Sequence, residues 1–70
     1  MLKRSLSIAG HRTSIALELE FWDGLEALAA HRQLPLTALI REIDETRQSA
    51  NLSSSLRIAV LEFYRSGGKN

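Results

Sequence analysis

The sequence predicts a mainly α-helical protein with one short β-strand, and three observations support this fold class. Residues 11–17 alternate between polar and apolar side chains, which is the period of a strand. Three later stretches carry apolar residues at helical spacing. The 70 residues are enough for one domain, and 44% of them are hydrophobic, which argues against disorder.

Residues 1–10 are expected to form a basic arm that carries Lys3 and Arg4 and alternates weakly near its end. Gly10 is expected to let this arm bend before the strand, because glycine tolerates unusual backbone angles. An arm that is extended or paired with another strand is the alternative.

The strand expected at 11–17 has two different faces. Its odd-numbered residues from Thr13 to Leu17 can join a core, whereas the other face carries Arg12, Ser14 and Ala16. It is the only clear strand in the sequence, and a lone strand would leave its backbone amides and carbonyls unpaired. We therefore expect a homodimer, in which the same strand of a second copy completes an antiparallel two-stranded ribbon.

A first helix is predicted at 19–32 from apolar residues at helical spacing, namely Phe21, Trp22, Leu25, Leu28 and Ala29. Gly24 weakens this helix by roughly 1 kcal/mol relative to alanine, which indicates that close packing requires it. We interpret Trp22 as an anchor of the core or of the dimer seam rather than as a platform for a base, because it shares the apolar stripe with Phe21 and Leu25.

A second helix is predicted at 36–47, since Pro35 ends the first helix and suits the start of the next. Its acidic residues are Glu42, Asp44 and Glu45. Only some of these side chains can share a direction on a helix, so we interpret them as a solvated face and not as a catalytic or metal site.

A third helix is predicted at 53–65, with Ser53 as its N-cap and Leu52 packed at its start. It is apolar on nearly every side, which is difficult to bury within one short subunit and gives a second indication of a dimer. The domain is thus expected to span 11–66, followed by a tail at 67–70. The residues expected in the dimer core are Ile15, Leu17, Trp22, Leu56, Val60 and Phe63.

Composition excludes several function classes. There is no cysteine for a disulfide or a thiolate, and His11 and His31 lie too far apart in sequence for typical zinc-ligand spacing. We expect no enzyme activity, no metal and no cofactor. No apolar run approaches the ~20 residues of a membrane span or resembles a signal peptide, so we expect a cytoplasmic protein without a membrane partner.

The net charge is only +1, but the charges are unevenly distributed. Residues 1–17 contain Lys3, Arg4 and Arg12 and no acidic residue, whereas residues 18–26 are acidic and contain no basic residue. The strand and its arm are therefore the basic part of the chain, and the next helix starts acidic, as the helix dipole favours. A solvated terminus is the alternative interpretation of Lys3 and Arg4.

The sequence resembles the ribbon-helix-helix family of bacterial DNA-binding proteins over about residues 3–65. The resemblance is carried by five short segments, namely Lys3-Arg4-Ser5, Gly10-His11-Arg12-Thr13-Ser14-Ile15, Leu17-Glu18, Glu20-Phe21-Trp22 and Asn51-Leu52-Ser53-Ser54. It implies an intertwined homodimer whose intermolecular antiparallel ribbon enters the major groove of double-stranded DNA, here with an additional helix.

The resemblance places the base contacts on Arg12, Ser14 and Ala16. Arginine can donate two hydrogen bonds to guanine, and serine can bond to several bases. Ala16 departs from the polar residue that the family often has there, and it would meet a thymine methyl group.

The family also binds the DNA backbone at a helix N-terminus, where free amides and the helix dipole suit a phosphate. Two positions remain open in this sequence. Spacing from the ribbon favours Thr37, whereas local resemblance favours Ser53 and Ser55, in which case residues 34–50 are an inserted helix. Lys3 and Arg4 are also expected to contact the backbone.

These features together predict a sequence-specific transcriptional regulator, similar to a repressor, whose partners are double-stranded DNA and a second copy of the chain. Two alternatives share the fold. One is an antitoxin-like protein that also binds a protein partner, and the other is a pure protein-interaction module, which the low net charge and Ala16 leave open.

Overall fold

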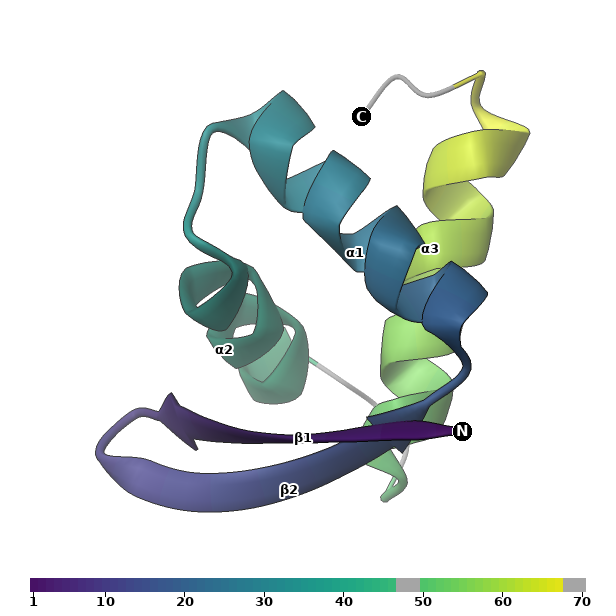
Figure 1. Ribbon diagram of the computed structural model, residues 1–70. Coiled ribbons are helices and arrows are strands. Elements are labelled where there is room, and N and C mark those ends of the chain that lie inside the picture. The colour runs from purple at the N-terminus through teal and green to yellow at the C-terminus, as the bar shows by residue number, and fades with distance from the viewer. Residues whose placement is uncertain (47–49, 68–70) are drawn as a thin grey trace.

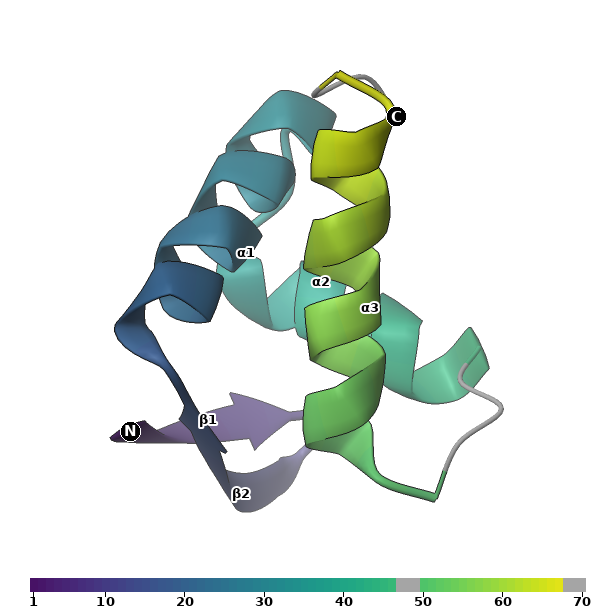
Figure 2. The ribbon, with the colours of Figure 1, turned by 90° about the vertical axis from the view of Figure 1, so that its right-hand side faces the viewer.

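A computed structural model describes residues 1–46 and 50–67 and shows a two-stranded antiparallel hairpin packed under three helices (Figure 1). Strand β1 spans Leu2–Ile8 and β2 spans His11–Leu17. The helices are α1 (Leu19–Arg32), α2 (Leu36–Thr46) and α3 (Leu52–Arg65). Helices α1 and α3 pack side by side, and α3 begins at the level of the hairpin (Figure 2).

The expectation of a single strand was wrong. Residues Leu2–Ile8, expected to be a basic arm, form β1, and β1 pairs with β2 in a register that runs from Leu2 opposite Leu17 to Ile8 opposite His11. The alternative of a paired arm describes the structure. Because β2 has a partner within its own chain, the need for a second copy no longer follows from an unpaired strand.

The hairpin closes through two residues with left-handed backbone angles. Ala9 has φ 52° and Gly10 has φ 82°, as the two central residues of a type I′ turn require. This turn has the twist that joins adjacent antiparallel strands, and glycine adopts the conformation without cost. Alanine pays a steric penalty there, so the turn is not made of its most favourable residues.

Each helix boundary has a local cause. Helix α1 ends where Gln33 adopts a left-handed conformation and Leu34 donates its amide to the Ala29 carbonyl. Helix α3 is capped by Asn51, whose side-chain oxygen accepts the Ser54 amide, so the cap is Asn51 and not Ser53 as expected. Residue 47, expected at the end of the second helix, lies outside the described residues.

The core forms within one chain. Its buried hydrophobic residues come from both strands and all three helices: Ile8, Ile15, Leu17, Trp22, Leu25, Leu28, Ala29, Leu39, Ile40, Leu56, Val60 and Phe63. This set contains all six residues that were expected in a dimer core. They are buried within one chain, so their burial alone does not indicate a second copy.

Within one chain, helix α3 is buried on one side. Leu56 and Val60 are buried, whereas Ile58 and Leu61 are each 54% exposed and Tyr64 is 55% exposed. These three exposed apolar residues are on the part of α3 that the expected second copy would cover.

Gly24 allows α1 and α3 to approach closely. A Cβ atom at this position would lie 2.5 Å from Cγ1 of Val60, nearer than two carbon atoms can pack. The structure thus confirms the close packing inferred from a glycine inside the first helix. Within the described parts of the chain, no helix is both long enough and apolar enough to cross a membrane.

Candidate nucleic-acid interface

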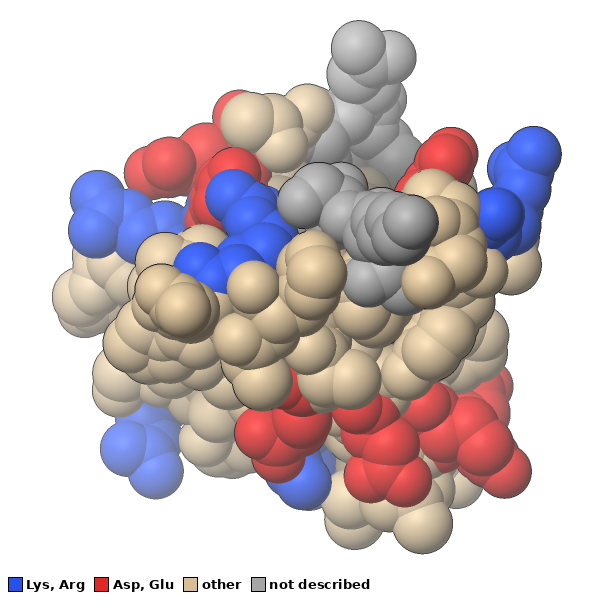
Figure 3. Space-filling model, turned by 90° about the horizontal axis from the view of Figure 1, so that it is seen from above, with Lys and Arg blue, Asp and Glu red and all other residues tan. Residues whose placement is uncertain are grey.

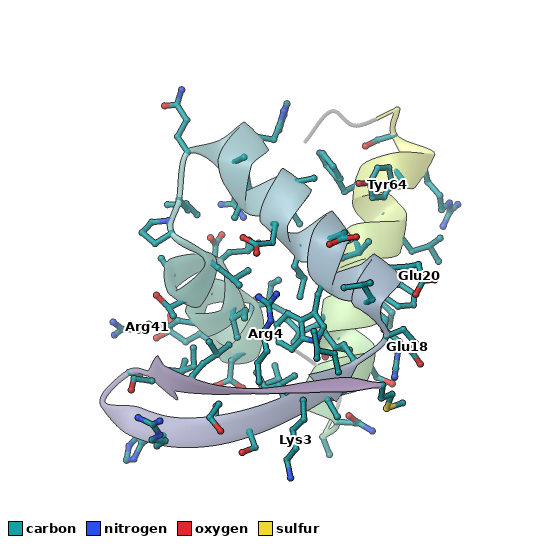
Figure 4. The ribbon with its side chains drawn as sticks, in the orientation of Figure 1. Lys3, Arg4, Glu18, Glu20, Arg41 and Tyr64 are labelled. Carbon is teal, nitrogen blue, oxygen red and sulfur yellow. The ribbon has the colours of Figure 1, made fainter. Side chains whose placement is uncertain are left out.

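The outer face of the hairpin, turned away from the helices, carries six small or polar side chains. They alternate along both strands and lie opposite one another in pairs: Lys3 and Ala16, Ser5 and Ser14, and Ser7 and Arg12. All are exposed except Ala16, which is half-buried, and none is acidic. We call this set the outer face. Figure 4 shows Lys3 pointing away from the helices.

Sequence reasoning found the β2 half of this face and missed Ser5 and Ser7. Their signal was the alternation of Lys3, Ser5 and Ser7 with residues that point inwards. The structure brings this second row beside Arg12 and Ser14, and the Ser5 and Ser14 hydroxyl oxygens lie 3.3 Å apart across the strands. The outer face is therefore twice as wide as a single strand would make it.

Arg4 lies on the opposite face from Lys3, pointing towards the helices (Figure 4). Its guanidinium carbon is 4.7 Å from the centre of a Trp22 ring, and its Nη1 is 3.5 Å from a Glu26 carboxylate oxygen. Both interactions favour the charged group in this position. Lys3 and Arg4 were both expected to contact the DNA backbone, but the structure places their side chains on opposite faces of the hairpin.

Trp22 ties the start of β1 to α1. Its indole Nε1 donates a hydrogen bond of 2.8 Å to the Leu2 carbonyl, while the ring itself is buried. The hairpin is also seated by Ile8, Ile15 and Leu17, which belong to the core. These contacts hold the outer face in a fixed position relative to the helices.

The outer edge of β2 is not paired with a strand in the described structure. In an antiparallel pair closed by a two-residue turn, alternate residues turn their backbone groups to the partner. Arg12, Ser14 and Ala16 therefore direct their amides and carbonyls to the outer edge. Consistent with this, the Ala16 carbonyl accepts a long hydrogen bond of 3.5 Å from the Ser53 hydroxyl.

A groove of about 670 Å³ lies beside this edge, between the hairpin, α2 and the start of α3. Its lining includes His11 and Ser14 from β2, Asp44 from α2, and Asn51 and Ser53 beside α3.

The two helix starts considered for a phosphate differ in their surroundings. Thr37 is exposed in the first turn of α2. Ser53 lies against β2 through its contact with Ala16, and the Ser55 hydroxyl donates to the Asn51 carbonyl at 3.4 Å. The start of α3 is thus the one that touches the base-reading strand proposed from the sequence.

A bidentate ion pair fixes the junction between the hairpin and the helices. Arg57 donates from Nε and Nη2 to the two carboxylate oxygens of Glu18, at 3.0 and 3.1 Å. The hydrogen bond from Arg57 lowers the pKa of the Glu18 carboxyl below its ordinary value, because it favours the charged form. Glu18 precedes α1 directly, so the pair joins the end of β2 to α3.

Other charged groups pair away from the hairpin. Arg32 meets Glu42 at 2.8 Å and Arg41 meets Glu45 at 3.1 Å, so two of the acids interpreted as a solvated face of α2 are paired. Neither Lys3 nor Arg12 has an ion-pair partner among the residues that the structure describes. On the side opposite the hairpin, acidic side chains gather along one edge (Figure 3).

The histidines do not form a metal site with other residues of the described chain. His31 packs with its ring centre 5.5 Å from that of Phe63, and His11 lies on β2. No group of three or more histidine or acidic side chains within residues 1–46 and 50–67 is arranged to hold a metal ion.

Comparison with known proteins gives a family and one structural neighbour. A family model described as a ribbon-helix-helix domain matches residues 1–64. An uncharacterized protein from Bordetella pertussis Tohama I has a similar structure, with a TM-score of 0.78 and 38% sequence identity over 96% of this chain. The match spans 59% of that protein's chain. A search of curated proteins gave no match.

Proposed function

Because the chain belongs to the ribbon-helix-helix family, we propose that it is a sequence-specific, repressor-like transcriptional regulator that inserts a β-ribbon into the major groove of DNA. Domains of this family are typically DNA-binding modules rather than enzymes. The observation that carries the proposal is the outer face, an acid-free surface with Lys3 and Arg12 that is fixed by the core on its other side.

The dimensions of the two partners agree. Neighbouring strands lie about 4.8 Å apart, and the major groove is about 12 Å wide and admits a two-stranded ribbon. A side chain without an intramolecular partner has no contact to break before it enters the groove. Arg12 meets this condition within the described chain, and it is exposed.

The base contacts are assigned to Arg12, Ser14 and Ala16. The Arg12 guanidinium donates to the O6 and N7 atoms of guanine, the Ser14 hydroxyl bonds to a base edge, and the Ala16 methyl contacts a thymine methyl group. One bidentate arginine contact discriminates against a wrong base by about 1–3 kcal/mol. Arg12 therefore provides most of the sequence preference.

A homodimer forms through the outer edge of β2, which offers the backbone groups of Arg12 and Ser14 and the amide of Ala16, whose carbonyl accepts a long hydrogen bond from Ser53. Two antiparallel copies centred on Ser14 place Arg12 opposite Ala16 of the second copy. Because the core residues are already buried within one chain, this dimer requires only edge pairing. The resulting operator has approximate two-fold symmetry.

The backbone contacts are assigned to Lys3 and to the start of α3, with Ser53 and Ser55. The hydrogen bond from the Ser53 hydroxyl to the Ala16 carbonyl supports the start of α3 over Thr37. Arg4 is occupied by Trp22 and Glu26 on the inner face, so we leave it out of the proposed interface.

Selection from random double-stranded DNA tests the proposal. We expect enrichment of a nearly palindromic site, and binding that weakens steeply with salt because phosphate contacts release counterions. Arg12→Ala should lose the preference for the selected site while keeping the fold. Arg41→Ala, which removes an exposed arginine of α2, is the matched control and should retain the preference.

Failure to enrich any sequence, together with binding that does not depend on salt, would contradict the proposal. The second candidate is a protein-interaction module, antitoxin-like or otherwise, and exposed Ile58, Leu61 and Tyr64 favour it because large apolar residues side by side suit a protein surface. That function predicts that Arg12→Ala has no effect on any activity of the chain.

A further inference from the structure

We propose that β1 carries a row of phosphate contacts, with Lys3, Ser5 and Ser7 flanking the base-reading residues of β2. The inference rests on the proposed DNA binding, in which Lys3 already contacts the backbone, and it adds Ser5 and Ser7. It follows from the hairpin, because a chain with only one strand would have no second row.

The order of the strands fixes where β1 meets DNA. When two copies pair through the outer edges of β2, the sheet has the order β1, β2, β2 of the partner, β1 of the partner. With strands about 4.8 Å apart, each β2 lies about 2.4 Å from the two-fold axis and each β1 about 7 Å from it.

The width of the groove then separates the two rows. A major groove about 12 Å wide extends about 6 Å to each side of its centre line. Side chains of β2 therefore project at the base edges, whereas side chains of β1 project at the two sugar-phosphate walls. The same pleat points both rows towards the DNA, because paired residues share a face.

The chemistry of the β1 row suits phosphates. Lys3 supplies a positive charge, and the Ser5 and Ser7 hydroxyls supply short donors to phosphate oxygens. Ser5 is within 3.3 Å of Ser14, so one hydroxyl of this pair can donate to the other while the second donates to DNA. All three β1 side chains are exposed, so they reach DNA without rearrangement.

The inner face makes this row rigid. The Leu2 carbonyl is bound by Trp22, and Arg4 is held between Trp22 and Glu26. Lys3 lies between these two anchored residues, and the pairing of β1 with β2 fixes Ser5 and Ser7. Contacts from a preorganised strand cost less ordering entropy than contacts from a flexible arm.

The test compares three variants of the full chain on the selected operator and on unrelated DNA of equal length. For Lys3→Gln we expect equal losses of affinity on both DNAs and a salt slope that is smaller by about 0.9 per lost contact, or about 1.8 per dimer. For Ser5→Ala combined with Ser7→Ala we expect a several-fold loss, again equal on both DNAs. Arg12→Ala should instead reduce the ratio between the two DNAs.

Arg65→Gln is the matched control for Lys3→Gln, because it also removes one exposed charge but lies on α3. It should leave affinity and salt slope nearly unchanged. All substituted side chains are exposed, and a thermal unfolding curve for each variant checks that the fold is kept.

Three outcomes overturn the inference. An unchanged salt slope for Lys3→Gln, with Arg12→Ala still affecting preference, removes the β1 row and leaves the proposed function intact. A change of preferred sequence in the double serine variant shows that β1 reads bases. In that case the ribbon in the major groove is the β1–β2 hairpin of one chain and not β2 from two copies. Absence of DNA binding by the unaltered chain overturns both proposals.

Discussion

The two faces of the β1–β2 hairpin come from the same alternating segments, yet they are held by different interactions. The inner face seats Ile8, Ile15 and Leu17 in the core, whereas the outer face buries no large side chain. Stability therefore depends on one face, and the other is free to vary with the partner. Arg4 is charged but lies on the inner, stabilising face, where its guanidinium packs over the Trp22 ring, whereas Lys3 lies on the outer face.

The largest expected difference is in the free energy of unfolding when one side chain on each face is truncated to alanine. Leu17→Ala on the inner face should lower the free energy of unfolding by about 2–5 kcal/mol, because Leu17 is fully buried and its loss leaves a cavity. Ser14→Ala on the outer face should change it by less than about 0.5 kcal/mol. Urea denaturation measures both, and equal effects would contradict the division between the faces.

The support beneath the inner face is tested by Gly24→Ala. The added methyl would collide with Val60, and overpacking costs about 1–3 kcal/mol, of which the better helix propensity of alanine recovers about 1 kcal/mol. We expect a net loss of stability in thermal unfolding.

Val60→Ala provides the matched test of this packing. Combined with Gly24→Ala, it should destabilise less than the sum of the two single changes, because the methyl then fills the space that the valine vacates. Additive effects would show that α1 and α3 do not meet at this point.

The turn joins the two strands without belonging to either face. Ala9→Asn should stabilise the hairpin by about 0.5–1 kcal/mol, because asparagine followed by glycine is the preferred pair of a type I′ turn. Ala9→Val should have the opposite effect, since a β-branched residue tolerates positive φ poorly. Urea midpoints of the two variants should therefore move in opposite directions.

The smallest expected effect concerns acid. The pKa of Glu18 is lowered in the folded chain by its hydrogen bonds from Arg57, so the pair contributes stability above the ordinary pKa of the carboxyl. This contribution disappears as the pH falls through the lowered value. Glu18→Gln should reduce the loss of thermal stability between pH 7 and acidic pH, as midpoints of thermal unfolding would record.

Glu20→Gln is the control, because Glu20 is exposed on α1 and forms no ion pair with another described residue. A larger change in acid sensitivity for Glu20→Gln than for Glu18→Gln would contradict the role of Arg57.

The helices and β2 could be predicted because their signals are local. Apolar spacing, Pro35 and the alternation of 11–17 each act within a few residues, so the observed bounds differ little from the expected ones. The strand β1 was missed because Arg4 occupies an inward position where alternation calls for an apolar residue. Arg4 points inwards because it packs on the Trp22 ring, and Trp22 lies far from Arg4 in the sequence. The turn also lacks the asparagine-glycine pair that signals a hairpin.

The site was only half predictable for a related reason. Periodicity placed Arg12 and Ser14 on one face of a strand, but only the pairing with β1 brings Ser5 and Ser7 beside them. The core showed the same limit. The apolar pattern of α3 does not tell which of its sides meets α1, so Val60 and Phe63 were expected in a dimer core, whereas the structure buries them within one chain.

The position of Trp22 gives the chain its own optical probe. It is the only tryptophan, and its ring is shielded from water. Its indole nitrogen donates a hydrogen bond to the carbonyl of Leu2, the first residue of β1. If β1 lifts from α1, this indole meets solvent and its emission moves to longer wavelength. Fluorescence of the unlabelled protein can therefore follow the docking of β1 in real time, with and without DNA, and separate it from the melting of the helices seen by circular dichroism.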